Sequence, residues 1–154
     1  MTFQSLEDAV FNANSLADPV KYVMQSRNPN ELFSDRRGGL ISVLHYMVMV
    51  KSKEGVSAML KIGADPNIKS SDGLTPLWTA MIVREFEIIQ LLVEGGADVN
   101  VREQERGDTL LHSALIAKRI DIAQYLLDHE ADPEVRNNLG ISARQLDAFN
   151  KLRY

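Results

Sequence analysis

The chain is 154 residues long, and its 17 basic and 21 acidic side chains give a formal net charge of −4. This mildly acidic balance argues against a nucleic-acid binder, because such proteins usually carry a basic surface. The absence of cysteine excludes disulfides and thiolate chemistry, and the absence of a run of about 18 apolar residues argues against a transmembrane helix.

The N-terminal residues also bear on the cellular location of the protein. Glu7 and Asp8 precede most of the apolar positions, and no basic residue does, which is unlike a secretory signal peptide. We therefore expect a cytoplasmic protein that forms one globular domain.

Residues 1–35 are predicted to form a pair of helices. Apolar residues recur at helical spacing over residues 3–14. Asp18 and Pro19 are suited to cap and begin a second helix, because proline fits the first helical position. The sequence Asn28-Pro29-Asn30 then resembles a loop that leaves this helix.

A first complete unit follows over residues 39–71, after a polar, glycine-rich stretch that predicts a hairpin tip at 35–39. Its pattern predicts one helix at about 43–51 and a second at about 54–62. Gly55 lies inside the second helix, where glycine costs about 1 kcal/mol relative to alanine. We therefore expect this unit to be the least stable one.

The clearest unit covers residues 72–104. Thr75 can cap a short helix with its hydroxyl group, and Pro76 suits the first position of that helix. A second apolar helix ends at Gly95-Gly96, because glycine adopts the left-handed conformation without strain. The unit is predicted as turn, short helix, turn, longer helix and loop.

The same order recurs along the chain. Gly63 and Gly96 begin matching Gly-Ala-Asp sequences 33 residues apart, and Glu130 begins a Glu-Ala-Asp sequence 34 residues later. The extra residue falls within residues 101–106, where we expect a longer, charged hairpin tip.

A period of about 33 residues that contains a turn and two helices resembles the ankyrin repeat family. The sequences TPLW, GADPN and GGADVN are close to that family's motifs. The resemblance implies an all-α fold, an ankyrin-repeat solenoid of stacked helix-turn-helix units with short β-hairpin-like loops. We expect one domain, 1–154, with an N-terminal capping helical pair (1–35), three repeats (39–71, 72–104 and 105–137) and a C-terminal cap (138–154).

The sequence contains no recognisable catalytic constellation. His45 and His112 occupy the same repeat position, and the resemblance implies that each bonds to backbone near a hairpin instead of binding a metal. Asp65, Asp98 and Asp132 recur with the repeat and are expected to bond to turn backbone. We expect no catalysis, metal or cofactor, and the alternative of an enzyme or small-molecule binder lacks a matched nucleophile and base.

The resemblance implies that a protein partner docks on a concave surface of inner helices and hairpin tips. Apolar residues near the end of each inner helix would form a strip on this surface, unless other segments cover the strip or it turns into the core. Trp78 replaces the family's usual histidine, and it either packs between inner helices or anchors a partner. The inner-helix residues expected to bind the partner are Tyr46, Met49, Val50, Trp78, Ile82, Val83 and Ile116.

The hairpin tips are expected to add mainly polar contacts, unless their charges are simply solvated. These tip residues are Arg36, Arg37, Lys69, Leu74, Arg102, Arg106 and Asp108. Because arginine forms bidentate contacts with carboxylates, the partner is expected to have a partly acidic surface.

The sequence therefore favours a non-enzymatic protein–protein interaction module that acts as an adaptor or regulatory scaffold and is monomeric when free. An alternative is a dedicated inhibitor or immunity protein that neutralises a toxin or enzyme by masking its active surface. A third is a homo-oligomer that buries the apolar strip against a second copy. Neither nucleic acid nor a membrane is expected as a partner.

Overall fold

The computed structural model of the protein describes residue 10, residues 17–35 and residues 38–146. The helix predicted over 3–14 therefore lies, apart from residue 10, outside the described residues, as does the end of the predicted C-terminal cap. The described elements are α2 (Ala17–Ser26), β1 (Leu32–Ser34), β2 (Leu40–Ser42), α3 (Val43–Met49), α4 (Lys53–Lys61), α5 (Pro76–Val83), α6 (Phe86–Glu94), α7 (Leu110–Ile116), α8 (Ile120–Asp128) and α9 (Ala143–Leu146).

These elements confirm the predicted helix-turn-helix architecture with a small hairpin. They fall into two compact units, Met1–Ala97 and Asp98–Tyr154. The assignment of a single domain with its repeat boundaries stays a prediction.

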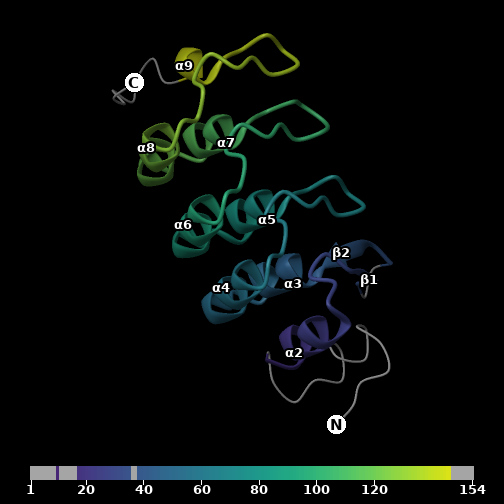
Figure 1. Ribbon diagram of the computed structural model, residues 1–154. Coiled ribbons are helices and arrows are strands. Elements are labelled where there is room, and N and C mark those ends of the chain that lie inside the picture. Colours follow the sequence, from purple (N-terminus) through teal and green to yellow (C-terminus); the bar gives the residue numbers. More distant parts are fainter. Residues whose placement is uncertain (1–9, 11–16, 36–37, 147–154) are drawn as a thin grey trace. The chain divides into compact units, whose positions relative to one another are not determined.

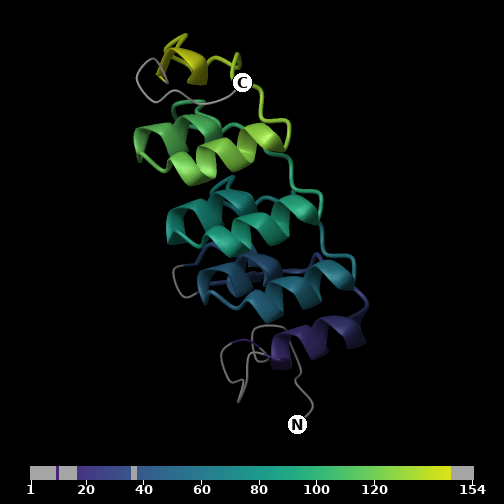
Figure 2. The same ribbon diagram turned by 90° about the vertical axis from the view of Figure 1, so that its left-hand side faces the viewer.

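In the first unit two helix pairs stack on each other, and helix α2 packs beside them. Helix α3 packs against α4, and α5 packs against α6 (Figure 1). In the stack, α3 contacts α5 and α4 contacts α6. Figure 2 shows α4 and α6 side by side. Helix α2 contacts α4, which is the position expected of a cap.

Polar residues begin the helices of the first unit, as the sequence predicts for Thr75. The hydroxyl of Thr75 accepts a hydrogen bond from the backbone N–H of Trp78 at 3.3 Å, and Pro76 occupies the first helical position. Ser52 caps α4 by accepting from the N–H of Gly55 at 3.0 Å. Each bond satisfies a donor that the first helical turn leaves without a partner.

Hydrogen bonds from asparagine and aspartate side chains connect the loops that follow α2, α4 and α6. We call this series of bonds the ladder. The Asp65 carboxylate accepts from the N–H of Asn67 at 2.8 Å, as predicted, and the Asn67 amide donates to the carbonyl of Gly96 at 3.1 Å. Asn30 accepts from the N–H of Asp65 at 2.7 Å. This bond confirms the interpretation of residues 28–30 as an exit loop, because Asn30 joins α2 to the same ladder.

Met47 and Gly55 fill one space in the core of the first unit. Met47 is fully buried in α3, and a Cβ atom placed on Gly55 in α4 would overlap Met47 Sδ and lie 2.9 Å from Met47 Cγ. The glycine in α4 therefore does more than weaken a helix, because it makes room for a long side chain from the neighbouring helix. The expectation that Gly55 only costs stability was incomplete for this reason.

The second unit contains α7, α8 and α9, with α7 in contact with both other helices. Its core includes Leu110, Leu111, Ile122 and Leu126, all fully buried. Helix α7 begins at Thr109, whose hydroxyl accepts from the N–H of His112 at 3.5 Å.

A tight loop precedes α7 and carries the extra residue. The N–H of Glu103 donates to the carbonyl of Asp108 at 3.0 Å, and the corresponding loop of the first unit closes one residue sooner, from Ser70 to Leu74 at 2.9 Å. Burial opposes the ionisation of Glu103, but the backbone N–H groups of the loop outweigh it and lower the pKa of this carboxylate. The predicted longer, charged tip is confirmed.

Candidate functional site

The candidate site is a groove in the first unit between two projecting loops and the inner helices. One loop is the β1–β2 hairpin, whose strands pair antiparallel with Phe33 opposite Ile41. The other is the loop of residues 70–74, which projects beside the hairpin in Figure 1. The N–H of Ser71 donates to the carbonyl of Leu40 at 2.9 Å, and the N–H of Leu40 donates to the hydroxyl of Ser71 at 3.0 Å. The two loops therefore form one connected wall.

His45 ties this wall to the inner helix α3. Its Nε2 donates to the carbonyl of Leu74 at 3.0 Å, while its Nδ1 accepts from the backbone N–H of Ser42 at 3.4 Å. Burial lowers the pKa of His45, and the bond to Leu74 only partly offsets this, so the imidazole is neutral at pH 7. The structural role that the sequence predicted for His45 is confirmed.

His112 makes the same kind of connection inside the second unit. Its Nε2 lies 3.0 Å from the carbonyl of Ile141, and its Nδ1 lies 2.8 Å from the hydroxyl of Thr109. Both histidines thus hold a loop at a fixed angle to an inner helix.

The groove contains a pocket of about 360 Å³, which we call the groove pocket. Its walls come from the hairpin, the 70–74 loop, α3 and α5. The lining residues are Asp35, Gly39, Ile41, His45, Met49, Ser70, Asp72, Leu74, Thr79, Ile82 and Val83.

The apolar part of the groove pocket is open to solvent. Ile82 is 61% exposed and Met49 is 48% exposed, although both are large hydrophobic side chains. Val50, which follows Met49 at the end of α3, is 37% exposed. Large apolar side chains that lie together and exposed are typical of interaction surfaces. Among the predicted apolar residues of the first unit, Met49, Val50 and Ile82 are therefore exposed.

Four of the predicted contact residues line the groove pocket: Met49, Leu74, Ile82 and Val83. Tyr46 is half-buried, and its ring packs edge to face on Phe33 of the hairpin with centroids 6.2 Å apart. Trp78 is only 7% exposed, which favours packing in the core over anchoring a partner. Lys69 is exposed and precedes the lining stretch of its loop.

The remaining predicted residues lie elsewhere. Arg36 and Arg37 are outside the described residues. In the second unit Ile116 is 54% exposed, whereas Arg102 donates to the carbonyl of Gly107 at 2.9 Å. Their contact with a partner stays a prediction.

Two further tip residues pair with each other in the second unit. Arg106 lies 3.1 Å from the carboxylate of Asp108, which is only 2% exposed and accepts from the Asn137 amide at 2.7 Å. These bonds give Asp108 a structural role inside its unit, and its contact with a partner stays a prediction.

Asp35 and Asp72 are lining residues that sequence reasoning did not assign to the site. Aspartate is common in turns whatever the turn faces, so each was interpreted as a turn former. Their common pocket follows from the bonds between the hairpin and the 70–74 loop, and no motif of the sequence encodes those bonds.

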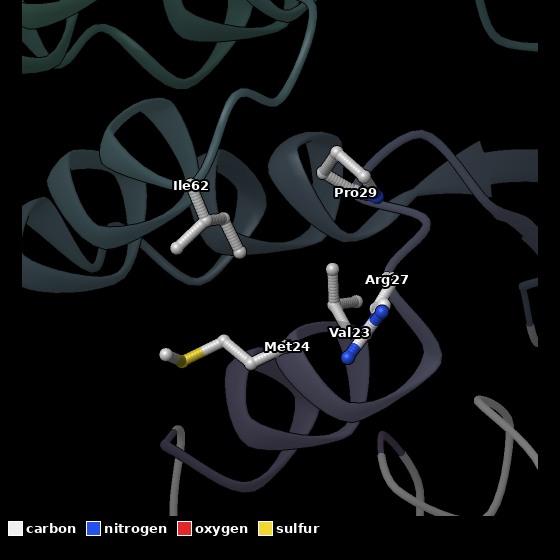
Figure 3. A pocket seen from close by; sticks show the side chains of 5 residues that line it. All are labelled: Val23, Met24, Arg27, Pro29 and Ile62. Carbon is white, nitrogen blue, oxygen red and sulfur yellow. The ribbon is translucent and has the colours of Figure 1, made fainter.

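A second pocket of about 290 Å³ lies between α2 and the end of α4 (Figure 3). Figure 3 shows Met24 and Ile62 on either side of it, with Val23, Arg27 and Pro29 completing the lining. Met24 is 59% exposed, much like Ile82. This pocket involves no inner helix or hairpin, and its exposed methionine provides a matched control for the groove.

The part of the chain that the structure describes contains no group of three or more histidine, aspartate or glutamate side chains that could hold a metal ion. Among the helices in the described ranges, none is long and apolar enough to cross a membrane.

Comparison with known proteins gives a family model and several relatives. The model for ankyrin repeats (3 copies) matches residues 44–137. Protein PhlB from Serratia liquefaciens is 34% identical over 71 residues, which make up 46% of this chain and 31% of that protein. Ankyrin repeat and SOCS box protein 16 from Homo sapiens is 31% identical over 111 residues, 72% of this chain and 24% of that protein.

A plant relative extends the comparison. BTB/POZ domain and ankyrin repeat-containing protein NPR3 from Oryza sativa subsp. japonica is 38% identical over 68 residues, 44% of this chain and 12% of that protein. The chain thus spans less than a third of the length of each of these three relatives.

Proposed function

The chain belongs to the ankyrin repeat family, and we propose that it is a non-enzymatic module that binds a protein partner through the groove of its first unit, as an adaptor or regulatory scaffold. Ankyrin repeats are generally protein–protein interaction modules, and the family is typically non-catalytic. The observation that carries the proposal is the exposure of Met49 and Ile82 in the groove pocket.

The rigidity of the groove supports this function. The strands of the hairpin, the 70–74 loop and α3 are joined by backbone bonds and by His45, so these described walls of the groove are held together without a partner. A preformed site avoids the entropy loss of ordering loops on binding. A partner that buries Met49 and Ile82 would also remove exposed apolar surface from water.

The test is capture of the partner from lysate of the source cells. Wild type is compared with Ile82→Glu and Met49→Glu, and Met24→Glu serves as the control because Met24 is equally exposed but lies in the other pocket. Each change places a carboxylate at an exposed site, so circular dichroism and urea unfolding should stay within about 0.5 kcal/mol of wild type.

We expect one stoichiometric protein with wild type and Met24→Glu, and its loss with both groove variants. Capture by both folded groove variants would contradict the proposal. A partner that is an enzyme or toxin inactivated by the wild-type chain would identify the role as inhibition instead of scaffolding. Light scattering of the free chain separates these outcomes from self-association.

A further inference from the structure

The groove pocket combines an open apolar floor with carboxylates and no basic side chain among its described lining residues. Ile41, Leu74 and Val83 join Met49 and Ile82 in the apolar part. Asp35 and Asp72 are the charged lining residues. His45 adds no positive charge at pH 7, because burial keeps it neutral. The described pocket is therefore apolar and negative.

The two carboxylates differ in what the fold requires of them. Asp35 accepts from the N–H of Gly39 at 2.8 Å and so helps to close the hairpin. Asp72 is exposed in the 70–74 loop, where Gly73 and not Asp72 has the positive φ of +73°. The turn thus does not depend on an aspartate at position 72, which makes this residue the suitable one to vary.

The size of the groove pocket limits its occupant. A volume of about 360 Å³ lies near the lower end of the range for small-molecule sites, about 300–1,000 Å³. The pocket can hold one or two aliphatic side chains of a partner segment whose backbone stays outside it. Charges beside such a side chain would then lie next to Asp35 and Asp72.

We propose that the groove pocket binds a partner segment in which an aliphatic side chain is flanked by lysine or arginine. This inference rests on the proposed function and specifies the partner's chemistry. The aliphatic side chain packs on Met49 and Ile82, and the flanking cation lies beside Asp72. The acidic partner expected from the tip arginines is the competing outcome, and Arg102 and Arg106 already make bonds within the second unit.

Methyl NMR of the full chain labelled at its methionines reports on this contact directly. Met49 lies in the groove pocket and Met24 in the second pocket, so each pocket has its own methyl reporter. The probes are synthetic peptides of equal length whose central residues are Lys-Leu-Arg, Glu-Leu-Glu or Lys-Ser-Arg. We expect Lys-Leu-Arg to shift the Met49 methyl signal and not that of Met24, with a Kd at least about tenfold lower than for either other peptide.

A charge exchange then separates recognition from a general effect on folding. Asp72→Lys should weaken the Lys-Leu-Arg peptide by about three- to tenfold and strengthen Glu-Leu-Glu by a similar factor, because exposed charge pairs are individually modest. Asp72→Asn should give intermediate values. All three proteins should unfold at the same urea concentration, because residue 72 is exposed.

Tighter binding of Glu-Leu-Glu by wild type would overturn the basic-segment proposal, as would equal affinities for wild type and Asp72→Lys. A shift of Met24 in place of Met49, or no methyl shift with any peptide, would also overturn it. In each case the proposed function stands if Ile82→Glu does not capture the protein that wild type captures from lysate. It fails only if that variant still captures the protein. The two failures are therefore distinguishable.

Discussion

Glu130 occupies a backbone conformation that glycine holds at the same position of the preceding repeat. Gly96 follows α6 with φ of +91°, and Glu130 follows α8 with φ of +67°. A side chain in the left-handed region costs about 1–2 kcal/mol, and the greater freedom of glycine in the unfolded chain returns about half of that. The sequence identified the substitution, and the structure shows that the backbone keeps the conformation despite it.

Glu130→Gly should therefore raise the free energy of unfolding by about 0.5–1 kcal/mol in urea titrations monitored by circular dichroism. The bond from Asn100 to the carbonyl of residue 130 is retained, because it involves only backbone at that position. Gly96→Glu is the reciprocal control and should lower stability. A neutral or destabilising Glu130→Gly would show that the left-handed conformation is not strained here.

Met47 and Gly55 provide a second test at the scale of single residues. Alanine in place of a helical glycine normally stabilises by about 0.5–1 kcal/mol. Here Gly55→Ala should instead destabilise by about 1 kcal/mol or more, because the new methyl group meets the buried Met47 side chain.

The double variant Met47→Ala/Gly55→Ala completes a double-mutant cycle with the two single variants. Met47→Ala alone should cost about 2–5 kcal/mol through the cavity that it leaves. The double variant should be more stable than the sum of the two single changes by at least about 1 kcal/mol, measured by urea unfolding. Additive losses would contradict the interpretation that the two residues share one space.

At the scale of elements, His45 joins helix α3 to the loop before α5. Its pKa is lowered in the folded protein, so the unfolded chain binds a proton more readily than the folded one below the ordinary value of 6.5. The stabilisation that depends on the neutral imidazole is therefore present above pH 6.5. It is lost as the pH falls from there through the lower pKa of the folded state.

His45→Gln should remove part of this pH dependence. Wild type should lose free energy of unfolding between pH 7.5 and pH 5.5, and the variant should lose less over the same interval. At pH 7.5 the variant should be less stable by about 1–3 kcal/mol, because one glutamine amide cannot keep both the bond to the carbonyl of Leu74 and the bond from the N–H of Ser42. An unchanged slope in His45→Gln would refute the role assigned to His45.

The elements were largely predictable from sequence because each has a local cause. Thr75 and Pro76 begin α5, and Gly96 ends the next helix, through backbone preferences that act within a few residues. The repeat period then placed His45 correctly, because the same bonding pattern recurs at His112.

The groove was only partly predictable, because its walls come from segments far apart in sequence. The helical spacing placed Met49 and Ile82 on the exposed face, whereas Asp35 and Asp72 meet through bonds between two loops. The compensation of Met47 by Gly55 was missed for the same reason, since it depends on contact between two helices. Residues whose role depends on such contacts between segments are the ones that sequence reasoning left unassigned.

At the scale of the whole molecule, the described features of the first unit support partner binding. The polar bonds of the first unit hold its loops and helices in place, and two of its large exposed apolar side chains, Met49 and Ile82, lie in the groove pocket. The second unit keeps Arg102 and Asp108 in its own bonds and exposes Ile116. Our account therefore assigns partner recognition first to the groove of the unit Met1–Ala97.

The most direct test of this assignment is the ratio of two dissociation constants, measured by calorimetry with the partner captured from lysate. Ile82→Glu and Met24→Glu introduce the same charge at side chains of nearly equal exposure, 61% and 59%. Our account predicts that Ile82→Glu raises the Kd at least about a hundredfold, because the carboxylate is buried unpaired against the partner, while Met24→Glu leaves it within about twofold of wild type. Equal effects of the two changes, or a larger effect of Met24→Glu, would contradict the groove as the binding site.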